Sequence, residues 1–256
     1  MNLRDRLYCS TIGEDAMEMA KHYGLGLEMA EFCTAENLDD KRDVWQPICR
    51  ERMQDASRFV FHAPFNEMCT CAVDPLVRHV TLYRFRQAAE MAASLGIRRM
   101  VYHSTHVPLL YFDCFFVEQS IGFWKEFLET QPQNLQIYLE NVVDVSPKPL
   151  LDVLEGVHDP RLRICLDVGH AHVSSEIPVE EWVQALAPFL GHIHVHDNCG
   201  DHDWHLPLGE GNIDWEHLFP LIESVAPGCT YTVENMVCHG TVQWLLDHHF
   251  LEEESV

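Results

Sequence analysis

Short apolar stretches alternate with longer stretches of helical periodicity along the whole chain. The apolar stretches predict eight strands, and the periodic stretches between them predict eight helices. The expected strands are 6–11, 25–32, 59–62, 100–103, 136–140, 163–167, 192–196 and 231–234. The expected helices are 14–23, 43–56, 75–95, 114–130, 148–157, 179–186, 214–225 and 241–251. The helix over 75–95 has the clearest ends, because Asp74 precedes Pro75 at its start and Gly96 follows it.

This strict alternation predicts parallel strands that are joined by helical crossovers. Eight such units in a chain of 256 residues predict a closed (β/α)8 TIM barrel, an α/β fold. A doubly wound open sheet is the alternative, but it would need a glycine-rich phosphate loop after the first strand, and residues 9–13 read CSTIG. No linker or low-complexity stretch interrupts the pattern, so residues 1–256 are expected to form one domain.

Charge narrows the classes of partner. The chain has 40 acidic residues against 17 Lys and Arg, a formal net charge of −23. A protein that coats nucleic acid needs cations opposite the phosphates, so this class is excluded. The last Lys or Arg is Arg163, and eleven of the seventeen histidines follow it. A segment that is rich in carboxylates and imidazoles is a source of ligands for divalent metal ions.

Two further features bear on the compartment. No apolar run approaches the ~18 residues of a membrane span, and the N-terminal stretch MNLRDRLYCSTIGEDA has no apolar signal core. We therefore expect a cytoplasmic protein. The ten cysteines form no CxxC pair, although Cys69 and Cys71 are separated by a single residue. Reduced cysteines of structural or incidental role are expected.

The candidate chemistry lies at the C-terminal ends of the strands, where the active site of a TIM barrel is built. Each of these polar residues could by itself be a helix cap or a hydrogen-bonded structural residue. Six successive strands, however, deliver such residues to one rim, and clustered carboxylates would repel one another without a cation. The pattern therefore predicts a divalent-metal site. Its candidate ligands are His62, His103, Glu140, Asp167, His170, His194, Asp203, His205 and Glu234.

Four motifs carry a family resemblance: LEN at Glu140, CLDxxH ending at His170, HxxD starting at His194, and DxHxxLGxG starting at Asp203. On these motifs the chain resembles the xylose isomerase-like TIM barrels (AP endonuclease family 2), from about the third strand onward. Within them it is most similar to endonuclease IV-like proteins, and it also resembles sugar phosphate isomerase/epimerase proteins.

The endonuclease IV resemblance implies a hydrolase with a multinuclear site, in which all nine candidate ligands hold two or three zinc ions. Glu140 would bridge a pair of ions, and a bridging hydroxide would attack phosphorus in a small or sugar-containing phosphoester.

The isomerase resemblance implies one manganese, cobalt or magnesium ion held by Glu140, Asp167, His194 and Glu234. Glu140 and Glu234 would then be the acid/base pair that moves a proton beside a sugar carbonyl. His62, His103, Asp203 and His205 would then bind sugar hydroxyls. A third hypothesis is a metal-binding barrel without catalysis.

Other residues are expected to contact the substrate or to support the ligands. His196 and Asp197 are expected to orient His194, while Phe65, Trp204 and Glu210 are expected to face the substrate. The early loops lack a clear set of basic or intercalating residues, and Phe65 stands where a DNA-penetrating loop would be expected, so duplex DNA is not an expected partner. The expected partner is a small molecule, a phosphoester or a sugar, and not a membrane. The sequence leaves the oligomeric state and the identity of the substrate open.

Overall fold

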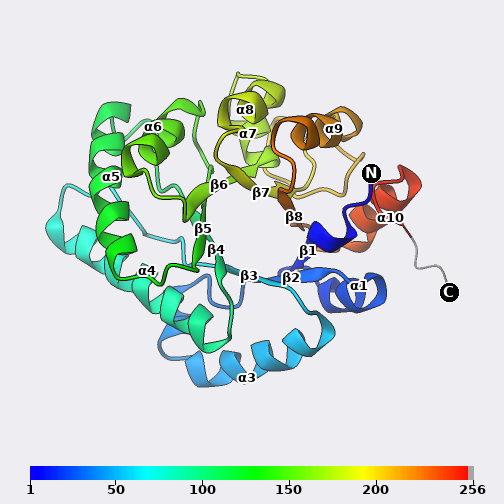
Figure 1. The fold of residues 1–256 in the computed structure, drawn as a ribbon, viewed down its shortest axis with the longest axis horizontal. Helices are drawn as coiled ribbons and strands as arrows, with labels where there is room; N and C mark the ends of the chain where they lie inside the picture. Colours follow the sequence, from blue (N-terminus) through cyan, green and yellow to red (C-terminus); the bar gives the residue numbers. More distant parts are fainter. Residues whose placement is uncertain (253–256) are drawn as a thin grey trace.

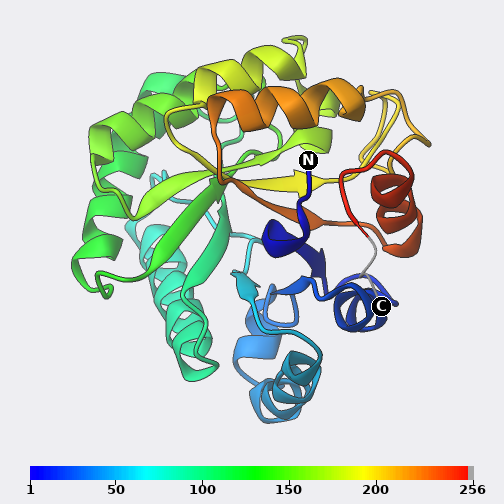
Figure 2. The same cartoon turned by 45° about the vertical axis from the view of Figure 1, so that its right-hand side comes forward.

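The computed structural model describes residues 1–252 and contains a closed barrel of eight parallel strands. Each strand pairs with its neighbour in sequence, and β8 pairs with β1 to close the ring. Figures 1 and 2 show the helices arranged around the outside of this barrel. The strands are β1 (Leu7–Ser10), β2 (Gly26–Met29), β3 (Phe59–His62), β4 (Arg99–His103), β5 (Gln136–Glu140), β6 (Leu162–Asp167), β7 (Leu190–Val195) and β8 (Thr230–Val233). The predicted TIM barrel is confirmed.

All eight predicted helices are present. They are α1 (Ala16–Tyr23), α3 (Arg42–Arg52), α4 (Pro75–Ser94), α5 (Asp113–Glu129), α6 (Lys148–Val157), α8 (Val179–Leu186), α9 (Trp215–Val225) and α10 (His239–Asp247). The predicted cap is observed, since the Asp74 carboxylate accepts a hydrogen bond of 2.8 Å from the Leu76 amide. Two short helices were not predicted, α2 (Ala35–Leu38) and α7 (Val168–Ser174), and the 3-10 turns η1 (Arg4–Arg6) and η2 (Met53–Asp55) flank β1 and α3. No helix within residues 1–252 combines the length and the apolar composition that crossing a bilayer requires.

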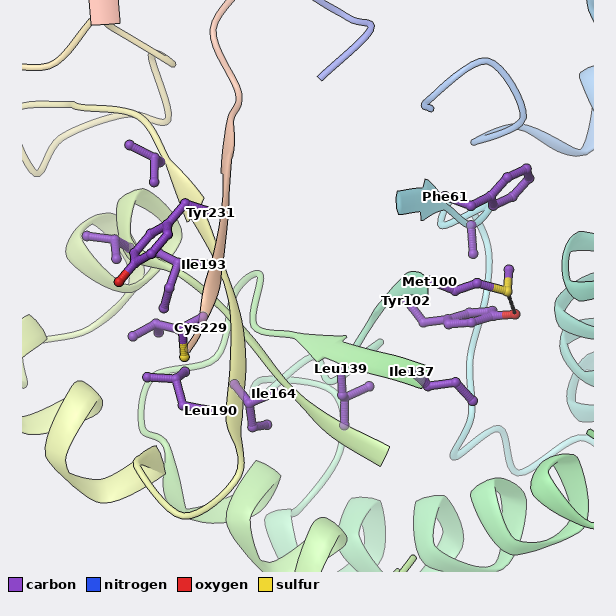
Figure 3. Packing of buried hydrophobic residues seen from close by; sticks show 14 of the residues in the cluster. Phe61, Met100, Tyr102, Ile137, Leu139, Ile164, Leu190, Ile193, Cys229 and Tyr231 are labelled. Carbon is purple, nitrogen blue, oxygen red and sulfur yellow. Dashed lines mark hydrogen bonds between the residues drawn. The ribbon is translucent and has the colours of Figure 1, made fainter. Parts of the chain in front are cut away.

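Successive side chains of a strand point to opposite faces, so each barrel strand supplies one set to the helices and another to the interior. Figure 3 shows the outward set, in which Phe61, Ile137 and Ile193 belong to the main buried core. A separate small cluster comprises Tyr8, Val60, Val101, Tyr138 and Cys165, which are the inward-facing neighbours in these strands. These side chains fill the interior of the barrel near the N-terminal ends of the strands. The inward-facing polar residues lie at the C-terminal ends of the strands.

Gly26 shows how tightly the interior is filled. A Cβ at this position would lie 2.2 Å from the ring of Tyr8, which is fully buried. Because Gly26 has no side chain, the Tyr8 ring can occupy this space, and it fills the barrel interior at this level.

Candidate metal centre

Strand register places the predicted ligands next to one another. His103, the last residue of β4, pairs with Glu140, the last residue of β5. Asp167, the last residue of β6, pairs in the same way with His194 of β7. Because paired residues of neighbouring strands share a face, each pair presents an imidazole beside a carboxylate at the C-terminal rim.

The first group surrounds the Nδ1 atom of His194. This atom lies 3.5 Å from Glu140 Oε1, 3.6 Å from Asp167 Oδ2 and 3.4 Å from Glu234 Oε2. The side chains of His194 and Asp167 are completely buried, and that of Glu140 is 1% exposed. Three carboxylates that arise from three strands therefore converge on one imidazole nitrogen beneath the rim.

The second group surrounds the other oxygen of Glu140. Its Oε2 atom lies 3.4 Å from His62 Nε2 and 3.4 Å from His103 Nε2. Glu140 thus faces His194 with one oxygen and this histidine pair with the other. A carboxylate in this position can bridge two neighbouring metal ions.

The third group is built by α7 and the loop after β7. Asp203 Oδ2 lies 3.2 Å from His170 Nε2 and 3.1 Å from His205 Nε2. Nδ1 of each histidine is held by a backbone carbonyl, that of Asn141 for His170 and that of Glu234 for His205. The two Nε2 atoms are therefore both directed at Asp203.

These groups fit a divalent metal ion. Ligand atoms bound at 2.0–2.1 Å to a tetrahedral zinc ion lie about 3.3 Å apart, close to the 3.4–3.6 Å measured around His194 Nδ1. Within residues 1–252, His194 Nδ1 and Glu140 Oε2 are buried without any hydrogen-bond partner. Buried polar atoms are normally paired, so these two orphaned atoms point to a ligand that satisfies them.

The charges of the site lead to the same conclusion. Burial acts to raise the pKa of Glu140, but the charge of His194 and hydrogen bonds from His170 and His194 outweigh it and hold this pKa well below its usual value. Burial lowers the pKa of His103 to about 3, so this imidazole is neutral and free to bind a metal. Burial also acts to lower the pKa of His205, yet Asp203 and Glu234 raise it to about 9. Metal binding must therefore displace protons, and it weakens as the pH falls.

A cavity of about 400 Å³ opens above these groups. Seven of the nine predicted ligands line it: His62, His103, Glu140, His170, Asp203, His205 and Glu234. The others, Asp167 and His194, lie fully buried beneath. Ile12, Ala30, Cys33, Phe65 and Val142 complete the wall, in which the described chain places no Lys or Arg. The cavity is large enough for a small molecule and offers it polar groups on an apolar wall.

Glu28 of β2 is a residue of the site that the sequence analysis missed. It is fully buried, and its Oε1 atom lies 3.2 Å from His194 Nε2. Its Oε2 atom lies 3.1 Å from His192 Nε2 and accepts a hydrogen bond of 2.6 Å from Thr232. Burial acts to raise the pKa of Glu28, but the two imidazoles keep it below its usual value. The ionised carboxylate accepts a hydrogen bond from Nε2 of His194, so the other ring nitrogen, Nδ1, faces the three carboxylates.

Glu28→Gln is expected to weaken metal binding by about 10–100-fold, the range found when a group that orients a metal-bound histidine is replaced. The amide has one acceptor oxygen where the structure requires two, and it carries no charge to strengthen His194 as a ligand. A competition titration with a chelating dye would measure the dissociation constant. Glu36→Gln, with a side chain 61% exposed, is the control. Equal affinities of the two variants would disprove the orienting role of Glu28.

Of the residues predicted to contact the substrate or to support the ligands, Phe65 lies where it was expected and His196 does not. Phe65 lines the cavity and stacks on His103 with ring centroids 4.4 Å apart. His196 was expected to orient His194, but its Nε2 atom lies 3.1 Å from Asp167 instead, and its ring stacks on His205. That expectation is wrong because Glu28, from the opposite side of the barrel, already occupies Nε2 of His194.

Asp197 acts on the loop that carries the third group. Its carboxylate accepts hydrogen bonds from the backbone amides of Asn198, Gly209 and Ile213, which fixes residues 198–213 above the rim. Trp204 is 55% exposed and donates to Asp201, while Glu210 is exposed in the same loop. Trp204 and Glu210 do not line the cavity, and their contact with substrate stays a prediction.

Comparisons with known proteins agree with this fold. The chain is 28% identical over 219 residues to an uncharacterized protein of Methanocaldococcus jannaschii, with 75% of this chain and 74% of that protein covered. It superimposes on a D-tagatose 3-epimerase-like protein with a TM-score of 0.78 at 24% identity, over 95% of this chain and 97% of that one.

Two further solved structures share the fold. A Thermus thermophilus protein that was soaked with zinc chloride has a TM-score of 0.74 and 26% identity, with coverages of 95% and 97%. D-psicose 3-epimerase of Clostridium cellulolyticum with D-tagatose has a TM-score of 0.69 at 14% identity, with coverages of 93% and 90%; at this identity the likeness shows the fold alone. The model of the xylose isomerase-like TIM barrel family matches residues 9–242, from the first strand into the last helix. The chain therefore belongs to the xylose isomerase-like TIM barrel family.

Proposed function

We propose that the protein is a metal-dependent isomerase or epimerase of a small sugar. The observation that carries the proposal is the convergence of Glu140, Asp167 and Glu234 on the Nδ1 atom of His194. This one group contains a complete set of metal ligands and two carboxylates that also line the cavity. The sugar epimerases among the structural neighbours support this reading over the hydrolase, which the motifs had favoured.

Glu140 and Glu234 are the acid/base pair of this proposal. They arise from β5 and β8, on different sides of the barrel, and both border the cavity. One carboxylate removes the proton from the carbon beside the sugar carbonyl, and the other returns a proton to the neighbouring position or to the opposite face. A divalent ion at His194, when bound, polarises the carbonyl oxygen and makes that proton acidic.

The cavity fits an uncharged sugar. His62, His103 and the Asp203 group surround it with hydrogen-bonding atoms, and Phe65 supplies an apolar wall. Sugar hydroxyls both donate and accept hydrogen bonds, which matches imidazoles that stand next to carboxylates. A phosphate group would meet no Lys or Arg among the described residues of the lining. We therefore expect a ketose or aldose without phosphate as the preferred substrate.

A turnover screen tests the proposal. The protein is loaded with zinc, manganese, cobalt or magnesium and incubated with ketoses, aldoses, their phosphates and phosphodiesters, and the products are separated by chromatography. Interconversion of sugars that disappears on addition of a chelator is the expected result. Hydrolysis of phosphodiesters without any sugar interconversion would contradict the proposal, and turnover of neither class would favour a barrel that only binds metal.

The second candidate is a phosphoester hydrolase with two or three zinc ions. It is favoured by one specific observation, the two further groups around Glu140 Oε2 and Asp203, which have the composition of metal sites of their own. Elemental analysis of the purified protein separates the candidates. Two or three zinc ions per chain, lost together in His103→Ala or His205→Ala, would support the hydrolase. One ion per chain, retained in both variants, would support the isomerase.

A further inference from the structure

Cys69 and Cys71 lie together in the turn between β3 and α4, outside the metal centre. Their Sγ atoms are 3.8 Å apart. Cys69 is half-buried, whereas Cys71 is fully buried. The pair therefore has one thiol that a small molecule can reach and a second thiol in contact with it.

The backbone between the two cysteines is fixed. The amide of Thr70 donates to the Thr105 hydroxyl at 3.0 Å, and the Thr70 hydroxyl lies 2.8 Å from that of Ser120. The amide of Cys69 donates to Thr81 at 3.0 Å. These bonds hold the turn against α4, α5 and the loop after β4, so the two sulfur atoms stay on one side of it.

Cys69 has the surroundings of a nucleophilic thiol. The thiol of Cys71 lies against its sulfur, and the Tyr111 hydroxyl is 3.6 Å away. Hydrogen bonding from Cys71 lowers the pKa of Cys69, while burial acts in the opposite direction and Tyr111 adds to the lowering. Thiolates are the reactive form of cysteine, and an exposed thiolate beside a second thiol is the arrangement of a dithiol that can be oxidised.

We propose that Cys69 and Cys71 are a reversible dithiol/disulfide site that exchanges with low-molecular-weight disulfides such as oxidised glutathione. The Cys69 thiolate attacks one sulfur of the small disulfide, forms a mixed disulfide and expels one thiolate. Cys71 then loses its proton and attacks the Cys69 sulfur, which expels the second thiol. Overall the protein loses two protons and two electrons, and the small disulfide is reduced to two thiols. The sulfur atoms move from 3.8 Å to about 2.05 Å apart.

This site is coupled to the rim of the barrel. Thr70 stands between the two cysteines and binds Thr105, which lies two residues after His103 and has a positive φ of 61°. A threonine in this backbone conformation is held there by its surroundings, and Thr70 is part of them.

Peptide mass spectrometry tests the proposal independently of any enzymatic activity. The reduced, full-length protein is equilibrated with mixtures of reduced and oxidised glutathione, alkylated and digested with trypsin. Cleavage after Arg58 and Arg78 places both cysteines in peptide 59–78, and the exposed Cys114 falls in a separate peptide. We expect peptide 59–78 to lose two hydrogens without gaining glutathione, while Cys114 gains glutathione.

Two variants distinguish the roles of the sulfur atoms. In Cys71→Ser, glutathione is expected to remain on Cys69, because nothing resolves the mixed disulfide. In Cys69→Ser, the buried Cys71 is expected to stay a free thiol. The proposal is overturned if peptide 59–78 of the unmodified chain stays reduced under conditions that glutathionylate Cys114, or if it carries glutathione as Cys71→Ser does. Circular dichroism spectra of both variants check that the fold is retained.

Discussion

Replacing Glu234 by glutamine is expected to slow sugar interconversion by about 10²–10⁴-fold, the contribution of one positioned acid or base. The glutamine keeps a carbonyl oxygen at the position that lies 3.4 Å from His194 Nδ1. The amide acts neither as an acid nor as a base at neutral pH, so the proton transfer loses one of its two participating groups. The measurement is kcat of the metal-saturated variant on the sugar that the screen identifies.

Metal content and a matched variant separate chemistry from folding. Glu216→Gln changes a carboxylate whose side chain is 70% exposed on α9, and it is expected to leave kcat unchanged. Glu234→Gln should still bind the ion, because Glu140, Asp167 and His194 remain. A loss of less than about tenfold with metal bound would mean that Glu234 is not one of the two proton-transfer groups.

His194→Ala is expected to weaken binding of the metal ion by more than about 100-fold, beyond the effect of replacing a group that only orients a ligand. The substitution removes the one nitrogen on which three carboxylates converge, and it leaves them at close range without this shared partner. Isothermal titration of the metal-free protein with zinc measures the change. Turnover should fall with the loss of metal, since the carbonyl is then no longer polarised.

His217→Ala is the control for this second prediction. His217 is exposed on α9, and its replacement should leave zinc affinity unchanged. The unfolding midpoint in urea of both metal-free variants checks that each is folded. If His194→Ala bound zinc as tightly as the unmodified chain, the ion would have to sit at one of the other two groups, and the assignment of the first group would be wrong.

The barrel could be predicted because its signal repeats. Apolar stretches and periodic stretches alternate eight times, and the bounds of β3, β5, α6 and α8 agree with the ranges expected from the sequence. The missed helices have a physical reason. α2 has four residues and α7 has seven, which is too short for an apolar face to recur clearly. Asp167 immediately precedes α7, and its carboxylate accepts a hydrogen bond from the His170 amide, so it serves as the helix N-cap as well as a candidate ligand.

The candidate ligands could be predicted for a related reason. Residues at the ends of parallel strands meet at one rim whichever residues lie between them, so sequence position alone placed His62, His103 and Glu140 together. Glu28 could not be found in this way, because it lies inside β2 and the apolar stretch around it does not reveal which residues face inward. The pairing of Ser10 with Glu28 and of Glu28 with Val60 settles this point in the structure.

The reaction was less well determined by sequence than the site. The same strand ends can hold one ion or several, because Glu140 directs one oxygen to His194 and the other to His62 and His103. The motifs alone had favoured the hydrolase. The proposal of a sugar isomerase or epimerase rests instead on the group around His194 and on the two carboxylates, Glu140 and Glu234, that line the cavity.

Incorporation of solvent deuterium shows directly whether the protein moves a proton at the carbon beside the sugar carbonyl. The metal-loaded protein is incubated in D₂O with the sugar that it interconverts, and proton NMR follows the carbon beside the carbonyl. Because Glu140 and Glu234 are proposed to carry the proton, the account predicts that solvent deuterium appears at this carbon in the product, and that the exchange is lost in Glu234→Gln. A product that forms at the same rate without any deuterium at this carbon would contradict the account.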